Sequence, residues 1–339
     1  MKSTHFTRRW LAKGLLAGAF AALAATAFAA EPPYPSKPIT LVVPFPAGGS
    51  LDVTARIIAD KLKDSLGQPV VIVNRPGAGT SVGARTVASA PPDGHTLLIT
   101  SGSAYGYLHL LIPSYELKLD DFAPIAAVAV NSSVIVARSD LPVKSLPQLV
   151  EYARSKPGTV SFCTTGVGGL NHLQLEMFRQ LVKAKTGKEF EATHVPYAGF
   201  APILVGLKGK QVDVCTAPYS SLVKNNHGKD LRVLAVQRDK RLPSLPDVAT
   251  TGEQGYPEMD GNDAFVNIAA PKGTPQPVLA RLEGAVLQAM RDPVVRKKIE
   301  DLDIEVLDMD SRATKKWLED DVKRLSAVIR QAGLDKQVK

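Results

Sequence analysis

The chain has 339 residues and carries 41 Lys and Arg against 33 Asp and Glu, for a formal net charge of +8 at pH 7. Four of the basic side chains lie within the first 29 residues, so the rest carries about +4, too weak a bias for a nucleic-acid-binding surface. The sequence has no low-complexity tract and no fixed-period repeat. The roughly 310 residues after position 29 are more than a single hydrophobic core usually supports, so we expect two lobes.

Residues 1–29 have the organisation of a secretory signal peptide. A basic start is followed by an apolar run from Leu15 to Phe28, which ends in the small-x-small site Ala27-Phe28-Ala29. The run is shorter than the roughly 20 apolar residues of a transmembrane helix, so we expect cleavage after Ala29 and export. The pair Arg8-Arg9 fits twin-arginine export as well as the general secretory route, and both stay open.

The most informative segment is a strand, turn and helix pattern over residues 37–56. An apolar run from Ile39 to Val43 leads into a turn rich in proline and glycine, and a helical pattern follows from Asp52 to Leu66. The first turn of a helix leaves backbone N–H groups unpaired and carries partial positive charge. Gly48 and Gly49 have no Cβ, so an anion could approach these groups; an ordinary capped turn is the alternative.

Two further strand patterns end in polar loops. Val70 to Val73 leads into the glycine-rich segment 74–80, and a helix of small residues follows as far as Ala90. Thr96 to Thr100 is a third strand, which ends at residues 101–103. The pattern indicates α/β alternation.

The middle of the chain repeats this scheme. Strands over 160–163, 192–195 and 212–215 lead into loops at 164–169, 196–199 and 216–218, and the first two loops precede helices that run to about Lys183 and Leu207. Ligands bind at the carboxyl ends of strands in open α/β sheets. Two lobes with these loops facing each other would form a cleft lined by backbone amides.

The remaining segments are interpreted as structural. The last third is mostly helical, with an amphipathic run from Trp317 to Ile329. Val128 to Val136 is predicted as one long strand that carries the chain between lobes, with a return near residues 256–266. The predicted domains are therefore residues 30–131 with 257–339 as lobe 1, and 132–256 as lobe 2.

Five segments of the chain resemble one known family. They read YPSKPITLVVPFPAGGSLDVTAR, NRPGAGTSVGARTVASAPPDGHTLL, HVPYAGFAPILVGLKGKQVD, RLPSLPDVATTGEQGYPEM and APKGTPQPVLARL, in this order. The chain is similar over nearly its whole mature length to the periplasmic solute-binding receptors of tripartite tricarboxylate transporters, the Bug or TctC-like family. The resemblance implies a two-lobed α/β clamshell of the periplasmic-binding-protein type, each lobe a mainly parallel sheet flanked by helices.

The resemblance also implies where a ligand binds. In the family, the loops that match residues 45–49 and 196–199 grip one carboxylate, partly through ordered water, and the loops at 164–169 and 101–103 help to hold the rest. The candidate ligand-binding residues are Phe45, Pro46, Ala47, Gly48, Gly49, Asp52, Gly79, Thr80, Ser101, Ser103, Thr164, Thr165, Gly168, His172, Pro196, Tyr197, Ala198 and Gly199. We expect no catalytic residue, metal or cofactor.

Some positions depart from the family pattern. Ala198 stands where the family often has Lys, so a second carboxylate of a ligand would lack one counter-charge. Cys163 and Thr164 replace a more usual pair of small residues. Phe265 stands where Trp is common and, with Tyr105 and Tyr107, could stack on an aromatic ligand, although core packing is the more common role of such residues.

Three other chemical interpretations were weighed. Residues 79–83 match the G-x-S-x-G nucleophile elbow, but Ser81 lies well past its strand, whereas an elbow serine follows the strand directly. The glycines of the same loop miss the dinucleotide fingerprint by one residue. His172 and Glu176 stand one helical turn apart, but no third metal ligand is spaced with them.

The only two cysteines, Cys163 and Cys215, each follow a β-branched run. A disulfide between them is possible in an oxidising compartment if their strands are neighbours, and so are two buried thiols.

The expected function is that of a periplasmic receptor without catalytic activity, which captures a small organic carboxylate for membrane permease subunits. The carboxylate could be a dicarboxylate, a tricarboxylate, an acidic amino acid or an aromatic acid. A secreted α/β-hydrolase using Ser81 and a sensory co-receptor for a membrane kinase are the alternatives. The sequence leaves the ligand, the permease and the oligomeric state open.

Overall fold

The computed structural model describes residues 34–77, 80–101, 108–111, 115–167, 169–219, 221–261, 264–331, 333 and 335. The chain divides into two units, Met1–Ser36 and Lys37–Lys339, and every element below belongs to the second. The predicted signal peptide, with its arginine pair, lies outside the described residues.

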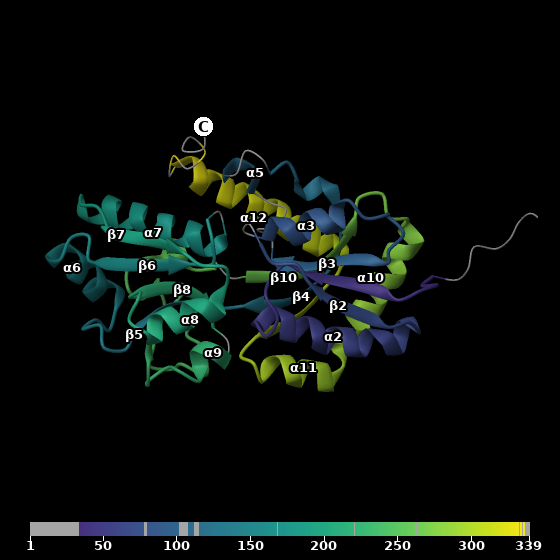
Figure 1. Ribbon diagram of the computed structural model, residues 1–339, viewed down its shortest axis with the longest axis horizontal. Coiled ribbons are helices and arrows are strands. Elements are labelled where there is room, and N and C mark those ends of the chain that lie inside the picture. Colours follow the sequence, from purple (N-terminus) through teal and green to yellow (C-terminus); the bar gives the residue numbers. More distant parts are fainter. Residues whose placement is uncertain are drawn as a thin grey trace, which may run out of the picture. The chain divides into compact units, whose positions relative to one another are not determined.

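The first sheet has six strands in the order β11-β4-β10-β3-β1-β2 (Figure 1). They are β1 (Ile39–Val43), β2 (Val70–Asn74), β3 (Thr96–Ser101), β4 (Phe122–Asn131), β10 (Ala264–Pro271) and β11 (Glu305–Met309). Its helices are α2 (Ser50–Leu66), α3 (Ser81–Ala88), α5 (Leu108–Leu111), α10 (Gln276–Arg291), α11 (Pro293–Glu300) and α12 (Ser311–Gln331), with a 3-10 turn at Leu119–Asp121. Helices α2, α10 and α11 lie on one side of the sheet, and α3 and α12 on the other (Figure 1).

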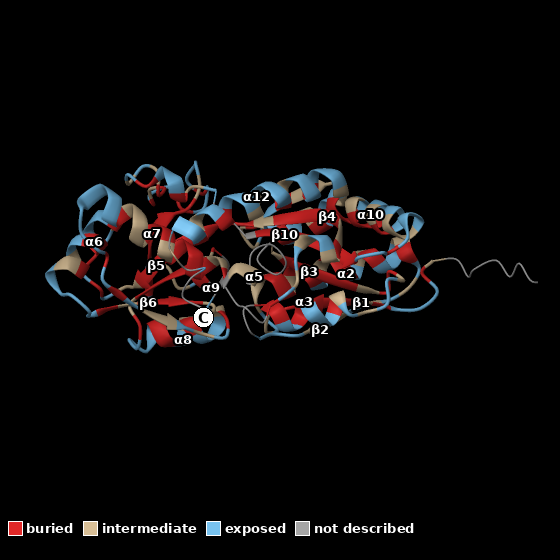
Figure 2. Ribbon diagram, turned by 90° about the horizontal axis from the view of Figure 1, so that it is seen from above, coloured by how far each residue is buried: buried red, intermediate tan, exposed pale blue. Residues whose placement is uncertain are grey.

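The second sheet has five strands in the order β7-β6-β8-β5-β9. They are β5 (Ser133–Arg138), β6 (Val160–Thr164), β7 (Ala192–Pro196), β8 (Val214–Pro218) and β9 (Leu231–Val236). Helices α6 (Leu146–Ser155) and α7 (Leu170–Thr186) contribute to one buried cluster, and α8 (Phe200–Lys208) and α9 (Ser221–Lys224) to another, with a 3-10 turn at Pro257–Met259. In Figure 2 the inner strands of both sheets are largely red, so the two cores are built around them, whereas the edge strands β2, β7 and β11 contain mostly half-buried and exposed residues.

Each sheet is mixed, whereas the sequence predicted mainly parallel sheets. β1 pairs in parallel with β2 and β3, but β10 is antiparallel to β3 and β4, and β11 is antiparallel to β4. In the second sheet β6 is parallel to β7 and β8, and β5 is antiparallel to β8 and β9. The antiparallel partners come from distant segments, which a strand-by-strand pattern does not reveal. The two-lobed α/β architecture itself is confirmed.

The long strand predicted over residues 128–136 is two strands in different sheets. β4 ends at Asn131 in the first sheet, and β5 begins at Ser133 in the second. The chain returns from β9, which ends at Val236, to β10, which begins at Ala264. The two sheets are therefore joined through two crossings of the chain.

The flanks of the two sheets also touch. Arg238, which follows β9, forms an ion pair with Glu305 of β11 (N–O distance 2.7 Å), and Lys224 of α9 pairs with Asp303 at 2.7 Å. On another flank, α12 packs on α7 in a small apolar cluster that includes Leu173, Leu325 and Ile329, all nearly fully buried. Helix α12 thus contacts elements of both sheets.

Helix α2 illustrates why the local sequence folds as it does. The helix begins after Gly49 and ends at Gly67, whose left-handed conformation (φ 72°) lets its N–H donate to the carbonyl of Lys63 at 2.9 Å. Its buried stripe has helical spacing and comprises Leu51, Ala55, Ile58, Leu62 and Leu66. Burial of this stripe fixes the helix against the sheet.

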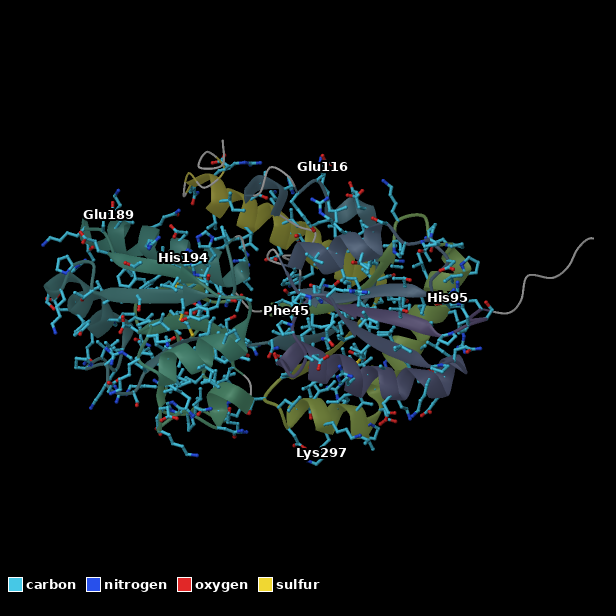
Figure 3. All side chains as sticks on the ribbon, viewed as in Figure 1. Phe45, His95, Glu116, Glu189, His194 and Lys297 are labelled. Carbon is cyan, nitrogen blue, oxygen red and sulfur yellow. The ribbon has the colours of Figure 1, made fainter. Side chains whose placement is uncertain are left out.

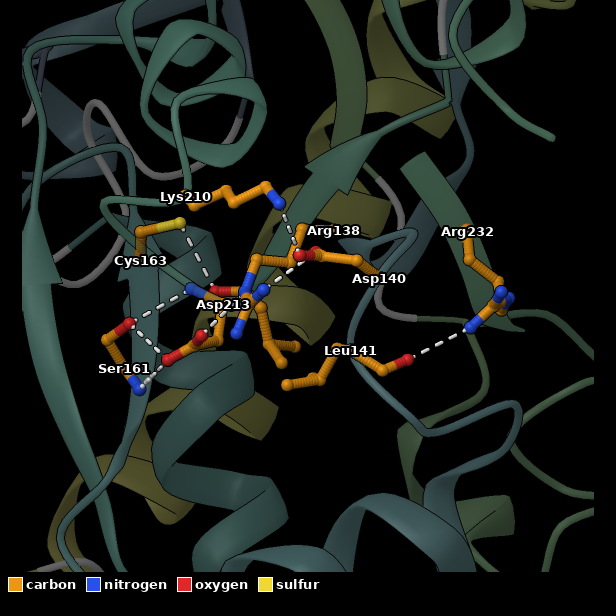
Figure 4. A network of polar contacts seen from close by, with 9 residues as sticks. Arg138, Asp140, Leu141, Ser161, Cys163, Lys210, Asp213 and Arg232 are labelled. Atoms are coloured by element: carbon orange, nitrogen blue, oxygen red, sulfur yellow. Dashed lines mark hydrogen bonds and ion pairs between the residues drawn. The ribbon is translucent and has the colours of Figure 1, made fainter. Parts of the chain in front are cut away.

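A polar network holds the second sheet together near Asp213 (Figure 4). The carboxylate of Asp213 accepts hydrogen bonds from Arg138 Nε at 2.8 Å, from Ser161 N at 2.8 Å and from Ser161 Oγ at 2.7 Å. Arg138 also bonds Asp140, which pairs with Lys210. The network joins β5 and β6 to the segment before β8, and therefore fixes the positions of these strands.

Within the described part of the chain, no helix combines the length and the apolar character that crossing a membrane requires.

Gly83 permits a close contact between α3 and the end of β1. A Cβ added at Gly83 would lie 2.7 Å from Pro44 Cβ and 3.1 Å from the carbonyl oxygen of Arg75, closer than such atoms approach. We therefore expect Gly83→Ala to lower the free energy of unfolding by about 1–3 kcal/mol, as overpacking does. Urea denaturation measures the change.

Gly284, in the exposed face of α10, is the matched control. No atom lies within 4 Å of a Cβ added there, so Gly284→Ala should raise stability by up to about 1 kcal/mol through helix propensity. Equal effects of the two substitutions would contradict the packing explanation.

Candidate functional site

The candidate site lies where the parallel strands of both sheets end. The loop after β1, residues 44–49, approaches the loop after β7: a Cβ added at Gly199 would lie 3.5 Å from two ring carbons of Pro46. Figure 3 shows Phe45 of the first loop between the two sheets. The two loops predicted to share one carboxylate therefore lie beside each other.

Two long helices begin at this edge with the same geometry. Gly49 precedes α2 with φ −74° and ψ 165°, and Gly169 precedes α7 with φ −70° and ψ 164°. Neither glycine can offer a side-chain cap to the first turn. A third helix, α8, follows Gly199, which has a different backbone conformation, with φ 154° and ψ 178°. Glycine therefore precedes all three helices at this edge, and at that position it offers no side-chain cap that would compete with an anion.

Asp52 organises the loop that precedes α2. Its buried carboxylate accepts hydrogen bonds from Gly48 N (2.9 Å), Asn74 Nδ2 (2.9 Å), and Arg56 Nε and Nη2 (3.0 Å each). Burial raises the pKa of Asp52, but the bonds from Arg56, Gly48 and Asn74 outweigh it and leave the pKa below its usual value. Because both carboxylate oxygens already accept hydrogen bonds from the protein, we infer that Asp52 supports the site by fixing the loop before α2 and not by contacting a ligand.

Two asparagines complete this support, and the sequence analysis assigned a role to neither. Asn74, at the end of β2, also donates to the carbonyl of Phe45 at 3.0 Å. Asn131, at the end of β4, donates to Ser50 Oγ in the first turn of α2 at 3.0 Å. Their only sequence signal is an amide residue at a strand end.

Thr80 has an unusual conformation for its residue type. It precedes α3 with φ 85°, a left-handed conformation that is strained by roughly 1–2 kcal/mol in a β-branched residue. Its buried hydroxyl has no hydrogen-bond partner among the described residues. Strain and an unpaired hydroxyl together are typical of functional positions.

The loop after β6 has its own internal bonds. Thr164 Oγ1 lies 2.7 Å from His194 Nε2 and 3.4 Å from the carbonyl of Gly166. Thr165 Oγ1 donates to Asn171 Oδ1 at 2.8 Å. The sequence analysis did not single out Asn171, which lies in the first turn of α7, or His194, whose contact with Thr164 is set by the register of β6 and β7.

His172 is buried and packs in parallel on His194, with ring centroids 4.5 Å apart. Burial, then the nearby His194 and Arg179, lower the pKa of His172 to about 4. Burial, then Arg179, also lower the pKa of His194. Both rings are therefore neutral near pH 7, and the side chain of His172 lies within the lobe behind the loop.

Two aromatic candidates pack inside the protein. The hydroxyl of Tyr197 points at α8, since a Cβ added at Gly206 would lie 2.6 Å from it. Phe265 is buried and stacks on Trp317 with centroids 3.7 Å apart, which favours its core role over stacking on a ligand. Any ligand contact of the Tyr197 loop therefore involves its backbone, which stays a prediction, as does the role of Ala198.

Five predicted residues lie outside the described part of the chain: Gly79, Ser103, Tyr105, Tyr107 and Gly168. The described candidates at the strand ends include the exposed Ala47, Gly48 and Pro196 and the half-buried Thr165, with Ser101 ending β3. These positions place the candidates at one edge, and their contact with a ligand stays a prediction.

The alternative chemistries find little support in this geometry. β2 ends at Asn74 while Ser81 opens α3, so Ser81 does not stand on a strand-to-helix elbow. Among the described residues, no three His, Cys, Asp or Glu side chains gather as a metal site. Cys163 and Cys215 are neighbours in the β6–β8 register, and both are buried and free. They are therefore two buried thiols and not a disulfide.

Removing the carboxylate charge of Asp52 should loosen the first loop. In Asp52→Asn the bonds from Arg56 and Gly48 weaken, and we expect unfolding free energy to fall by about 1–3 kcal/mol. Urea denaturation measures it. Asp60→Asn, in the same helix but at an exposed pair with Lys63, is the control and should leave the midpoint unchanged. Equal effects of the two would show that Asp52 has no special role.

The lowered pKa of His172 predicts a pH effect on stability. Because the unfolded chain binds this proton near pH 6.5 and the folded protein only near pH 4, stability is complete above pH 6.5 and falls as the pH drops towards 4, by up to about 3 kcal/mol. Unfolding measured at several pH values should give a shallower dependence for His172→Gln. Equal slopes for both proteins would contradict this explanation.

Comparison with known proteins places the chain in a family. The model of the tripartite tricarboxylate transporter family receptor matches residues 54–334. Protein BugT of Bordetella pertussis is 34% identical over 302 residues, 88% of this chain and 90% of that protein. The periplasmic binding protein BugD has a TM-score of 0.80 at 31% identity, covering 89% of this chain and 99% of BugD.

A third similar protein was solved with a ligand. MatC of Rhodopseudomonas palustris, with bound malate, has a TM-score of 0.80 at 29% identity, covering 87% of this chain and 100% of MatC. The resemblance inferred from the sequence is confirmed, because the family model matches most of the chain. The chain belongs to the tripartite tricarboxylate transporter receptor family, a family of periplasmic solute-binding proteins.

Proposed function

We propose that the chain is a periplasmic receptor that binds a small organic carboxylate in the cleft between its lobes and delivers it to the membrane subunits of a tripartite transporter. The observation that carries the proposal is the meeting of the loop 44–49 with the start of α8 at Gly199, each beside a helix start without a side-chain cap. Backbone N–H groups converging from two sides suit a carboxylate.

The polar groups around these loops support an anionic ligand. Asp52 would repel a carboxylate, but the guanidinium of Arg56 neutralises it at 3.0 Å. The buried hydroxyl of Thr80 at the start of α3 has no hydrogen-bond partner in the described part of the chain, and offers one further donor. Malate in the related MatC is a carboxylate of the size proposed here.

Binding would be coupled to the movement of two lobes, residues 30–131 with 257–339 and residues 132–256. In support of these boundaries, the chain passes between the sheets at Ser132 and in the segment between β9 and β10, although Met259 of that segment packs in the core of the second sheet. A ligand that contacts loops of both lobes binds the closed state better than the open one and so shifts the population to it. Closure would then be the state that the membrane subunits recognise.

We also propose that the protein has no catalytic activity. Ser81, the nucleophile of the hydrolase alternative, opens α3 beyond a glycine-rich loop and does not follow β2 directly. An esterase assay on the exported protein and on Ser81→Ala tests this directly. Hydrolysis that Ser81→Ala abolishes would establish the enzyme instead.

The first experiment is a thermal-shift screen of the protein purified from a bacterial periplasm. The panel contains malate, adipate, citrate, glutamate and benzoate, which represent the four expected carboxylate classes. Because a ligand of the folded state raises the melting temperature, at least one compound at 100 times its Kd should stabilise by about 2.7 kcal/mol. A panel without any shift would count against this ligand class.

The variant Gly49→Val tests the site itself. Gly49 has φ −74°, and the nearest atom to an added Cβ is 3.7 Å away, so valine fits the backbone without strain. Its side chain would cover the N–H groups of the first turn of α2 and should weaken binding of the active compound at least tenfold. Gly284→Ala, remote from these loops, is the control, and equal affinity of both variants would refute the assignment.

A further inference from the structure

His194 is a side chain of β7 that reaches across to the neighbouring strand. Its Nε2 lies 2.7 Å from Oγ1 of Thr164, the last residue of β6. Figure 3 shows His194 in the part of the molecule that the second sheet occupies, behind the edge where the candidate loops lie.

The hydroxyl of Thr164 links the His194 ring to the turn in front of α7. Thr164 Oγ1 lies 2.7 Å from His194 Nε2 and 3.4 Å from the carbonyl oxygen of Gly166, and the tautomer of His194 decides which group donates in the shorter bond. The carbonyl of Gly166 also accepts from Gly169 N at 3.4 Å, which closes the turn. A run of polar contacts therefore leads from His194 to the turn, and hydrogen bonds in such networks strengthen one another.

Thr164 also joins the two loops of the second sheet. Its backbone carbonyl accepts from Tyr197 N at 2.9 Å, in the loop that approaches Pro46. The side chain of Thr164 holds one loop and its backbone holds the other. A change at His194 is therefore transmitted to both loops.

The surroundings of His194 keep its ring neutral and in place. His172 of α7 stacks on it at 15° between the ring planes, and His172 Nε2 lies 3.9 Å from Glu176 of the same helix. Arg179 bonds Glu176 and the backbone carbonyl of Ala192 in β7, so the one cation of the group is paired. A neutral ring can make the bond with Thr164 through Nε2 either as donor or as acceptor.

We propose that His194 is a positioning residue, which holds the 164–169 turn and the 196–199 loop through Thr164 in the arrangement that presents the start of α7 to a carboxylate. This proposal rests on the proposed function for the identity of its ligand. The fixed conformation of the two loops, however, is a property of the ligand-free protein and can be measured without a ligand. It adds a residue outside the predicted set of ligand contacts.

Amide hydrogen exchange of the ligand-free protein tests the proposal. His194→Phe keeps a ring to stack on His172 but removes the hydrogen-bonding nitrogen, and should speed exchange in peptides spanning residues 164–173 and 196–201 at least tenfold. Thr164→Val removes the hydroxyl at the other end of the bond and should speed exchange in the same peptides to the same extent. The double variant should exchange no faster than either single variant. Peptides spanning the β1–α2 loop, residues 44–54, serve as the internal control.

His194→Gln retains a hydrogen-bonding group at a similar reach and should restore most of the protection. If the hydrogen bond positions the loops, His194→Gln should protect them better than His194→Phe does. If ring packing positions the loops, His194→Phe should protect them better. Unchanged loop exchange in His194→Phe or equal acceleration in the 44–54 control would each overturn the proposal.

The carboxylate panel distinguishes a failure of this proposal from a failure of the proposed function. Compounds that shift the wild-type protein should bind His194→Phe at least fivefold more weakly and His194→Gln nearly normally. If no compound shifts the wild-type protein, the proposed function is contradicted, while hydrogen exchange still decides the role of His194.

Discussion

The starts of α2, α7 and α8 are the constraint on which the site depends. Helix starts are normally closed by a Ser, Thr, Asp or Asn side chain, and here glycine stands in that position each time. The absence of a side chain leaves the amides accessible but gives the loop no rigidity of its own. Rigidity must therefore come from other elements: Asp52 and Asn74 hold the loop before α2, and Thr164 holds the loop before α7. The glycines before the helices and the side chains that hold the loops therefore belong to one arrangement, because the glycines leave room for an anion and the side chains supply the rigidity that glycine lacks.

The electrostatics of the site follow from the same arrangement. A carboxylate such as Asp52 beside a proposed anion site is unfavourable unless its charge is compensated, and Arg56 compensates it from one helical turn away. In the other lobe, burial keeps His172 and His194 neutral, while Glu176 pairs with Arg179. The side chains that support the loops are thus neutral or paired near pH 7, so the positive ends of the helices dominate the local field.

The sequence predicted the strand, loop and helix units because these depend on local patterns. The helix predicted from Asp52 to Leu66 is found at Ser50–Leu66, and the loop at 44–49 lies where expected. What the sequence could not supply depends on distant pairing. β10 enters the first sheet from residue 264 and makes it mixed, and His194 meets Thr164 only through the β6–β7 register. The partner of Phe265 depends on distant packing too, since this residue takes the core role that the sequence analysis named as the more common one and stacks on Trp317 of the last helix.

Contacts that join the flanks of the two sheets limit how the proposed lobes can move. The pairs Arg238–Glu305 and Lys224–Asp303 lie beside the segments through which the chain crosses between sheets, whereas the apolar contact of Leu325 and Ile329 with Leu173 lies on α7 itself. Partly exposed ion pairs exchange readily with water, so they can open and re-form at small cost. Separating buried leucine and isoleucine side chains exposes apolar surface at roughly 25 cal/mol per Å² and is costlier. The two ion pairs are therefore the contacts that a relative movement of the sheets would break at the lower cost, whereas the contact of α12 with the first turn of α7 resists separation.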